Sequence, residues 1–321
     1  MVSTYNRADS LPRLVAALES QQGVHPFEAV IVDDCSTDRT REALRELAQR
    51  TRFPLRVLQT PVNSGPATGR NLGWRAARAP LIAFTDDDCQ PDPAWLARLT
   101  AALEQADVVQ GQTRVDPVEL GGVGPFARVQ AIEEWSGLFE CCNIGYRREM
   151  LERIGGFDES FPRPFGEDVD LGWRAVEVGA NLAWAPEVLV IHDVETSGNR
   201  VRDWVLWMKD IRRRVYAALM VKKHPGLRTQ LHRRWFYKPH HPRTLAALVG
   251  LGIIATRPSG RLRWLAAGGL IAPWLHYRAV VDPRPARRRN YPVVLPLTFI
   301  GDAADVGVML VGSIRFRTIL L

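Results

Sequence analysis

The sequence contains only four cysteines, and its first 200 residues contain no lysine. Its four cysteines include an adjacent pair and show no C-x-x-C spacing, which argues against a zinc site and a disulfide framework and favours a reducing compartment. Met1 is followed almost directly by a polar segment, so we expect no N-terminal signal peptide. Hydrophobic residues make up 46% of the chain, which argues against global disorder and allows a sizeable core.

Two common nucleotide-binding fingerprints are also missing. Gly65 and Gly69 stand where a phosphate-binding loop could lie, but their spacing fits neither G-x-G-x-x-G nor G-x-x-x-x-G-K-[ST]. The sequence therefore argues against a dinucleotide-binding domain and against a P-loop. No recognition motif for nucleic acid accompanies the basic residues, so we expect no nucleic-acid partner.

Charge is divided unevenly along the chain. The net charge of +7 combines +17 in residues 201–321 with −10 in residues 1–200, and all four lysines lie in the second part. A chain of 321 residues can hold one large domain with an appendage. We therefore predict a first domain, residues 1–200, and a basic second region, residues 201–321, with a different role.

Strand and helix patterns alternate through the first hundred residues. Apolar runs predict strands at 27–32, 55–58 and 81–84, after a short first strand at the N-terminus. Segments with helical spacing lie between them, around 11–18, 40–50 and 65–77. This alternation predicts an α/β domain with a mostly parallel sheet, flanked by helices and joined by right-handed crossovers.

Three consecutive carboxylates, Asp86, Asp87 and Asp88, follow the strand at 81–84. Like charges repel one another, and open α/β sheets bind ligands at the carboxyl ends of their strands. A cation that bridges Asp86 and Asp88 to a diphosphate would relieve this repulsion, and oxygen ligands suit Mg²⁺ or Mn²⁺. The same residues could form a solvated acidic turn, so this pattern alone leaves both interpretations open.

Six short motifs stand in order along the first part of the chain. They are S-T-Y-N-R at 3–7, V-D-D-C-S-T-D at 32–38, N-S-G-P-A-T-G-R-N at 63–71, F-T-D-D-D at 84–88, G-G-F-D-E at 155–159 and G-E-D-V-D-L at 166–171. In order and spacing they resemble family 2 glycosyltransferases, over about residues 1–200. The resemblance implies a GT-A fold, a nucleotide-diphospho-sugar donor, a divalent cation and inversion at the anomeric carbon.

By position, the resemblance also implies the roles of individual residues. Those expected to bind the nucleotide sugar are Thr4, Tyr5, Arg7, Asp34, Gly65, Arg70, Asp86 and Asp87. Asp86 and Asp88 match a D-x-D metal pair, with Asp88 the expected direct ligand. His192 follows an apolar strand and stands where some GT-A enzymes place a further metal or diphosphate contact. A structural role for His192 stays equally open.

The resemblance assigns the general base to Asp168, beside Glu167. An inverting transfer needs a base on the face opposite the leaving diphosphate, within reach of an acceptor hydroxyl. Adjacent carboxylates can raise the pKa of one member toward the working range. The pair also fits the N-terminus of a helix, where carboxylates interact favourably with the helix dipole, and the two roles are compatible.

Two features depart from the family pattern. Several apolar residues normally precede the T-Y-N motif, whereas only Met1 and Val2 stand before Ser3, so we expect the true start to lie upstream. Residues 230–235, Q-L-H-R-R-W, resemble the Q-x-x-R-W motif of processive members, but Trp235 falls one residue late. We therefore expect transfer of a single sugar.

Three apolar stretches, 245–255, 262–281 and 292–314, follow a helical segment at 204–215. The first is too short to span a bilayer, and charged residues in the others make spanning costly. The arginines that flank these stretches are Arg257, Arg261, Arg284, Arg287, Arg288 and Arg289. They predict a mainly helical region that associates with the cytoplasmic face of the cell membrane, and the pattern leaves open whether it spans.

The leading hypothesis is an inverting glycosyltransferase that depends on Mg²⁺ or Mn²⁺. It would transfer one sugar from a nucleotide-diphospho-sugar to a cell-envelope glycan or lipid-linked acceptor. One alternative is a catalytically inactive, membrane-bound scaffold that binds the nucleotide sugar. Another is a sugar nucleotidyltransferase, which would need a Gly-rich signature with a basic residue near the N-terminus, and this chain has none there.

Overall fold

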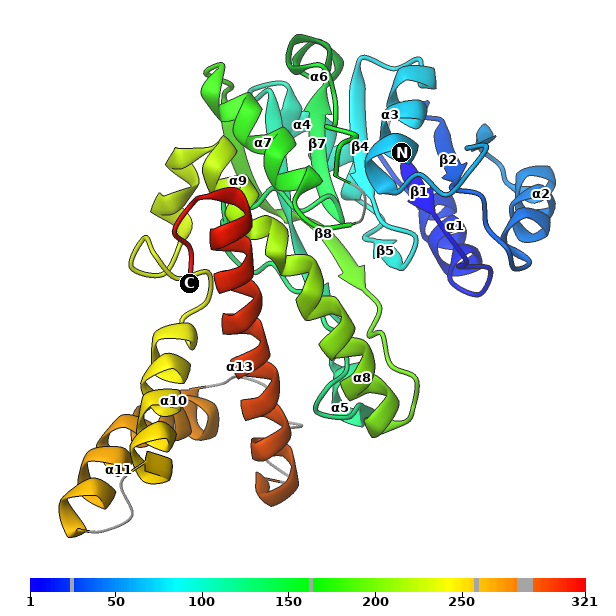
Figure 1. Cartoon of the computed structure of the whole chain (residues 1–321). Coiled ribbons are helices and arrows are strands. Elements are labelled where there is room, and N and C mark those ends of the chain that lie inside the picture. Colours follow the sequence, from blue (N-terminus) through cyan, green and yellow to red (C-terminus); the bar gives the residue numbers. More distant parts are fainter. Residues whose placement is uncertain (24–25, 162–163, 257–259, 282–290) are drawn as a thin grey trace. The chain divides into compact units, whose positions relative to one another are not determined.

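A computed structural model describes residues 1–23, 26–161, 164–256, 260–281 and 291–321 (Figure 1). The chain forms two compact units. The first unit comprises Met1–Leu120 and Val129–Val194, and the second comprises Gly121–Arg128 and Glu195–Leu321. Whether 1–200 and 201–321 are separate domains, as the sequence suggests, stays a prediction.

The first unit contains all the described strands that belong to sheets. They are β1 (Val2–Thr4), β2 (Ala29–Asp33), β3 (Leu55–Gln59), β4 (Leu81–Thr85), β5 (Cys89–Pro91), β6 (Val108–Val115), β7 (Asn143–Arg147) and β8 (Leu182–His192). Its helices are α1 (Leu11–Glu19), α2 (Thr40–Arg50), α3 (Pro66–Ala76), α4 (Trp95–Leu103), α6 (Arg148–Ile154) and α7 (Glu167–Glu177). A short helix, α5 (Pro117–Gly122), runs from the first unit into the second.

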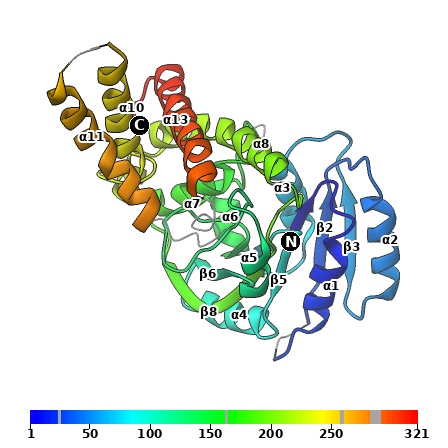
Figure 2. The ribbon, with the colours of Figure 1, turned by 90° about the horizontal axis from the view of Figure 1, so that it is seen from below.

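The first sheet is parallel, in the order β1-β2-β3, and α1 and α2 lie next to it (Figure 2). The helical spacing at 11–18 reflects burial, because Leu11, Leu14, Val15 and Leu18 are all buried on one face of α1. The helix predicted at 40–50 is α2. Two hydrogen bonds join β1 to β4: the Met1 nitrogen donates to the Ala83 carbonyl, and the Thr85 N–H donates to the Met1 carbonyl.

The second sheet has the order β4-β7-β6-β8-β5 and is mixed. Only β6 and β8 pair in parallel, whereas β7 is antiparallel to β4 and β6, and β5 is antiparallel to β8. The α/β class is confirmed, but this sheet is less parallel than the strand–helix alternation predicts. The difference arises after β6, where residues 116–142, which include only the six-residue helix α5 as an assigned helix, bring the chain back to β7 in the antiparallel direction.

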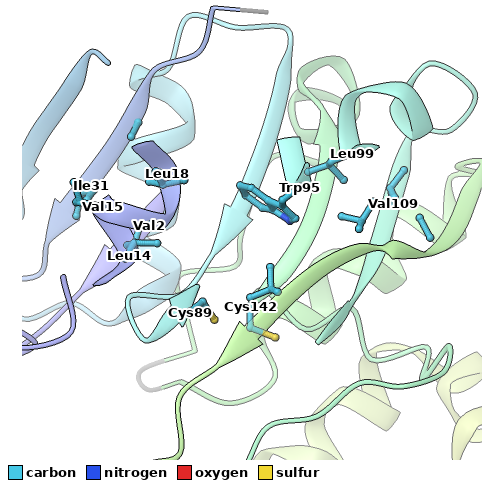
Figure 3. Close-up of a cluster of buried hydrophobic side chains, with 14 of the residues drawn as sticks. Val2, Leu14, Val15, Leu18, Ile31, Cys89, Trp95, Leu99, Val109 and Cys142 are labelled. Atoms are coloured by element: carbon cyan, nitrogen blue, oxygen red, sulfur yellow. The ribbon is translucent and has the colours of Figure 1, made fainter. Parts of the chain in front are cut away.

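A cluster of buried apolar side chains packs helices against both sheets (Figure 3). It includes Val2 of β1 and Leu14 of α1 beside the first sheet, and Trp95 of α4 and Val109 of β6 beside or within the second. The indole N–H of Trp95 donates to Asn143 Oδ1 at 2.8 Å, so the one polar atom of this buried ring is satisfied. This core fixes the strand ends from which the site residues project.

The second unit is mainly helical. Its helices are α8 (Arg200–Ile211), η1 (Arg212–Tyr216), α9 (Ala217–Lys223), η2 (Pro225–Gln230), α10 (His241–Thr256), α11 (Arg261–His276), η3 (Tyr277–Val281) and α13 (Tyr291–Phe316). Among the described residues one helical segment, Val293–Phe316, is long and apolar enough to cross a membrane, with a mean hydropathy of 1.7. Length and composition alone also allow a core helix. Arg257, Arg284, Arg287, Arg288 and Arg289 lie outside the described residues.

The two carboxylates inside α13, Asp302 and Asp305, are buried and paired. Asp302 accepts hydrogen bonds at 2.8 Å from the Trp274 indole and from Arg278 Nε. Asp305 accepts a hydrogen bond from Arg214. Each carboxylate is only 1% exposed. The network neutralises the two carboxylates that make α13 costly to place in lipid, because each is matched by an arginine within the same unit.

Candidate active site

Two loops at the carboxyl ends of β1 and β2 are tied together by Asn6. Its Oδ1 accepts a hydrogen bond from the Thr37 N–H at 2.8 Å, and its own N–H donates to Ser36 Oγ at 3.0 Å. Asn6 has a φ of 55°, a conformation that asparagine tolerates better than most residues. The neighbouring Tyr5 is 44% exposed, so its ring is open to a ligand at this edge.

Asp34 holds the loop that leads into α3. Its carboxylate accepts hydrogen bonds from the Thr60 hydroxyl at 2.7 Å, from the Ser64 N–H at 2.9 Å and from the Gly65 N–H at 2.8 Å. Gly65 has a φ of 87°, which favours glycine directly before Pro66 begins the helix. The structure thus gives Asp34 three partners within the chain, and its contact with a nucleotide stays a prediction.

The acidic triplet after β4 faces Arg7. Arg7 Nε lies 3.6 Å from Asp87 Oδ1, and Arg7 Nη2 lies 3.4 Å from Asp88 Oδ2. Asp87 is only 7% exposed. Burial, and then the charge of Asp88, raise the pKa of Asp87 to about 7, against the opposing effect of the Thr4 hydroxyl and of Arg7. These carboxylates are therefore not a freely solvated turn.

Arg70 connects the acidic triplet to the predicted base. Its guanidinium donates to Asp86 Oδ1 at 3.0 Å and to Glu167 Oε1 at 2.8 Å, and it lies over the ring of Phe157. Arg70 is 8% exposed and Glu167 is 3% exposed. This buried fork brings together two carboxylates that are 81 residues apart in the sequence.

Asp168 lies in the first turn of α7, which begins at Glu167 directly after Gly166, whose φ is 97°. Its Oδ1 accepts a hydrogen bond from the Val169 N–H at 2.8 Å. Burial, followed by the charge of Glu167, raises the pKa of Asp168, while Arg70 opposes this effect. The helix-terminus role and the electrostatics expected of a general base therefore occur together.

His192, at the end of β8, faces Asp88. His192 Nε2 lies 3.4 Å from Asp88 Oδ1, and each of Asp88, Cys89 and His192 places one ligand atom within 4.8 Å of the others. His192 Nδ1 lies 2.9 Å from the Asp193 carbonyl oxygen. A carbonyl that accepts from Nδ1–H leaves Nε2 with its lone pair toward Asp88, as in many metal sites. Asp88 and His192 therefore fit Mn²⁺ or Mg²⁺, whereas Asp86 is held by Arg70.

Two asparagines that the sequence analysis did not identify hold loops and strands near the site in place through hydrogen bonds. Asn71 donates to the Phe157 carbonyl at 2.9 Å and accepts from the Phe157 N–H at 2.9 Å, which fixes the loop at 155–159. Asn143 donates to the Gln112 and Val188 carbonyls, both at 2.7 Å. The position of Asn71, directly after Arg70 in a motif, could have identified it, whereas no local pattern marks Asn143.

The chain matches known proteins in this same region. The sequence model of glycosyl transferase family 2 matches residues 1–155. The chain carries a family 2 glycosyltransferase domain. This confirms the family that the motifs predict for this domain, and relatives that are named glycosyltransferases match the chain.

Two curated relatives support this result. The chain is 29% identical over 220 residues to the pre-mycofactocin glycosyltransferase of Mycobacterium tuberculosis, covering 64% of this chain and 44% of the relative. It is 28% identical over 211 residues to the validoxylamine A glucosyltransferase of Streptomyces hygroscopicus, covering 54% of this chain and 50% of the relative. The chain spans about half the length of these relatives.

The fold also matches solved structures. A mannosyltransferase from Pyrobaculum calidifontis, in complex with GDP-Man and Mn²⁺, aligns with a TM-score of 0.54 and 18% sequence identity. The alignment covers 98% of this chain and 85% of the mannosyltransferase chain. The GT-A-type α/β fold is therefore confirmed for this domain.

Proposed function

We propose that this glycosyltransferase moves a single sugar from a nucleotide-diphospho-sugar to an acceptor hydroxyl, with inversion at the anomeric carbon. The Arg70 fork carries this proposal, because it holds Asp86 of the predicted metal pair and Glu167, the neighbour of the predicted base, with one buried side chain. The donor-side and acceptor-side motifs thus meet at one edge of the sheet, as a transfer reaction requires.

Asp88 and His192 would hold a divalent cation. Asp86 would be a further ligand through its Oδ2, because Arg70 donates to its Oδ1. A bound Mg²⁺ or Mn²⁺ offsets negative charge on the departing diphosphate. Arg7, which lies beside Asp87 and Asp88, adds a positive charge at the same place. Thr4, Tyr5 and the Gly65 loop remain our predicted contacts to the nucleotide.

Asp168 would accept the proton of the acceptor hydroxyl. As that oxygen bonds to the anomeric carbon, the bond from this carbon to the β-phosphate oxygen breaks, and the nucleoside diphosphate leaves with the electron pair. Glu167 stays bound to Arg70 and to the Phe165 N–H, so it positions the helix turn and leaves Asp168 to move the proton.

We further propose a cell-envelope glycan or lipid-linked acceptor, reached at the cytoplasmic face of the membrane. Among the described residues, 17 of the 21 exposed large apolar side chains lie in the second unit, although this unit is the shorter one. These exposed apolar side chains accompany a strong excess of arginine in residues 201–321. This supports membrane association.

The first experiment measures release of nucleoside diphosphate from UDP-, GDP- and dTDP-sugars by the full chain, with Mn²⁺ or with EDTA. We expect release from one donor class with Mn²⁺ and its loss in EDTA. A scaffold would bind a donor without releasing nucleoside diphosphate. A nucleotidyltransferase would instead form a nucleotide sugar from a sugar phosphate and a nucleoside triphosphate, with pyrophosphate as the other product.

A further inference from the structure

The loop at 135–140 is docked onto α7, the helix that carries Asp168. The Trp173 indole donates to the Gly137 carbonyl at 3.1 Å, and Gln110 Nε2 donates to the Glu140 carbonyl at 3.2 Å. Within the loop, the Ser136 hydroxyl donates to Glu140 Oε2 at 2.9 Å. These contacts hold the loop at Gly137 and at Glu140.

Phe139 is the anchor of this loop. It is 1% exposed and has a φ of 56°, a strained conformation for a phenylalanine. Its ring packs against Gly172 so closely that a Cβ at this glycine would lie 2.0 Å from Phe139 Cγ. Residues four apart share one face of a helix, so Gly172 lies one turn along α7 on the face of Asp168. Phe139 therefore covers the turn next to the predicted base.

Trp135 packs against Phe139. Its ring centroid lies 5.3 Å from that of Phe139, at an interplanar angle of 87°, and the residue is only half-buried. Because Trp135 is half-buried while Phe139 is buried, Trp135 is the member of this aromatic pair that a ligand can reach. The loop ends in Glu140, which is also half-buried and whose charge acts on Asp168. Trp135 thus packs on the residue that covers the helical turn next to Asp168, and Glu140 is near enough for its charge to raise the pKa of Asp168.

We propose that Trp135 and Glu140 form the acceptor subsite, and that the acceptor is a pyranoside whose ring stacks on Trp135 while Glu140 accepts a hydrogen bond from one of its hydroxyls. This inference rests on the proposed glycosyl transfer. A pyranose has an apolar face that suits an indole, and hydroxyls that suit a carboxylate, whereas a sugar-free alcohol lacks both. The subsite therefore selects acceptors by the sugar that bears the reacting hydroxyl.

The test uses the full chain with its preferred donor and Mn²⁺. The acceptors are octyl β-glucoside, octyl β-galactoside and octyl α-mannoside, with octanol as the sugar-free control. We expect at least one octyl glycoside to be glycosylated and octanol not to be. We expect Trp135→Ala to raise the KM for that glycoside about tenfold and Trp135→Phe to raise it less, because stacking contributes on the order of a factor of ten.

Glu140→Gln is expected to raise the same KM, whereas Glu133→Gln, on the exposed part of this segment, should leave it unchanged. Glu133→Gln should also keep the wild-type rate of nucleoside diphosphate release without acceptor. The inference is overturned if no octyl glycoside is glycosylated, if Trp135→Ala leaves the KM unchanged, or if this variant loses acceptor-free release in parallel. Absence of release in the wild type would instead refute the proposed function itself.

Discussion

Replacing Asp168 by asparagine is expected to lower the rate of sugar transfer by about 10²- to 10⁴-fold. Asparagine keeps the size of the side chain but cannot accept the proton of the acceptor hydroxyl. Nucleotide affinity should not change, because Asp168 lies in α7 and not in the donor-side loops. Steady-state rates, together with calorimetric titration of the nucleoside diphosphate, measure the two quantities separately.

The control is Glu177→Gln, at the exposed far end of the same helix, which should keep full activity.

The dependence of the transfer rate on pH gives a further test of Asp168. Burial, Glu167 and Glu140 raise the pKa of Asp168 and Arg70 lowers it, with a net rise. A base must be deprotonated, so activity should fall as the pH drops through a value well above that of an ordinary aspartate. Full activity in Asp168→Asn would remove this residue from the reaction.

Replacing Arg70 by methionine is expected to cost about 3–5 kcal/mol of folding free energy, the usual effect of removing one partner from a buried ion pair. The change leaves Glu167 buried without its guanidinium and frees Asp86. Chemical denaturation at pH 7.5 measures this loss of stability.

Arg75→Met is the matched control on the same helix. Arg75 is 52% exposed at its side chain and pairs with Glu159, which is also exposed, so its loss should change stability by no more than about 0.5 kcal/mol. Arg70→Lys should fall between the two, because lysine keeps the charge but cannot bind both carboxylates with a planar fork. Equal stabilities of Arg70→Met and Arg75→Met would contradict the bridging role of Arg70.

Local patterns predicted the parts of the fold that local physics determines. The apolar face of α1 and the limits of α2 follow from helical periodicity, and the three carboxylates after β4 follow from an apolar run that ends in charge. The family resemblance then assigned Asp168 and Arg70 to the site, and their roles stay predictions. These features depend on residues a few positions apart, which a sequence displays directly.

Contacts between distant residues were not predictable in the same way. β7 pairs antiparallel with β4 and β6, and this pairing depends on where residues 116–142 return the chain. The hydrogen bond from the Gly65 N–H to Asp34 and the bonds from Arg70 to two carboxylates were likewise not visible in the sequence, and the ligand-binding roles of Asp34 and Arg70 stay predictions. The packing of Phe139 on Gly172 was equally invisible, because it joins a loop to a helix that begins 28 residues later.

The most direct test of the central claim is calorimetric titration of the full chain with UDP and GDP, in Mn²⁺ or in EDTA. If Asp88 and His192 hold a cation that binds the diphosphate, one nucleotide should bind in Mn²⁺ and not in EDTA. Asp88→Asn should lose this binding, and Glu46→Gln, on the exposed surface of α2, should retain it. Equal affinity in Mn²⁺ and EDTA, or unchanged binding in Asp88→Asn, would contradict a metal-dependent donor site at this edge of the sheet.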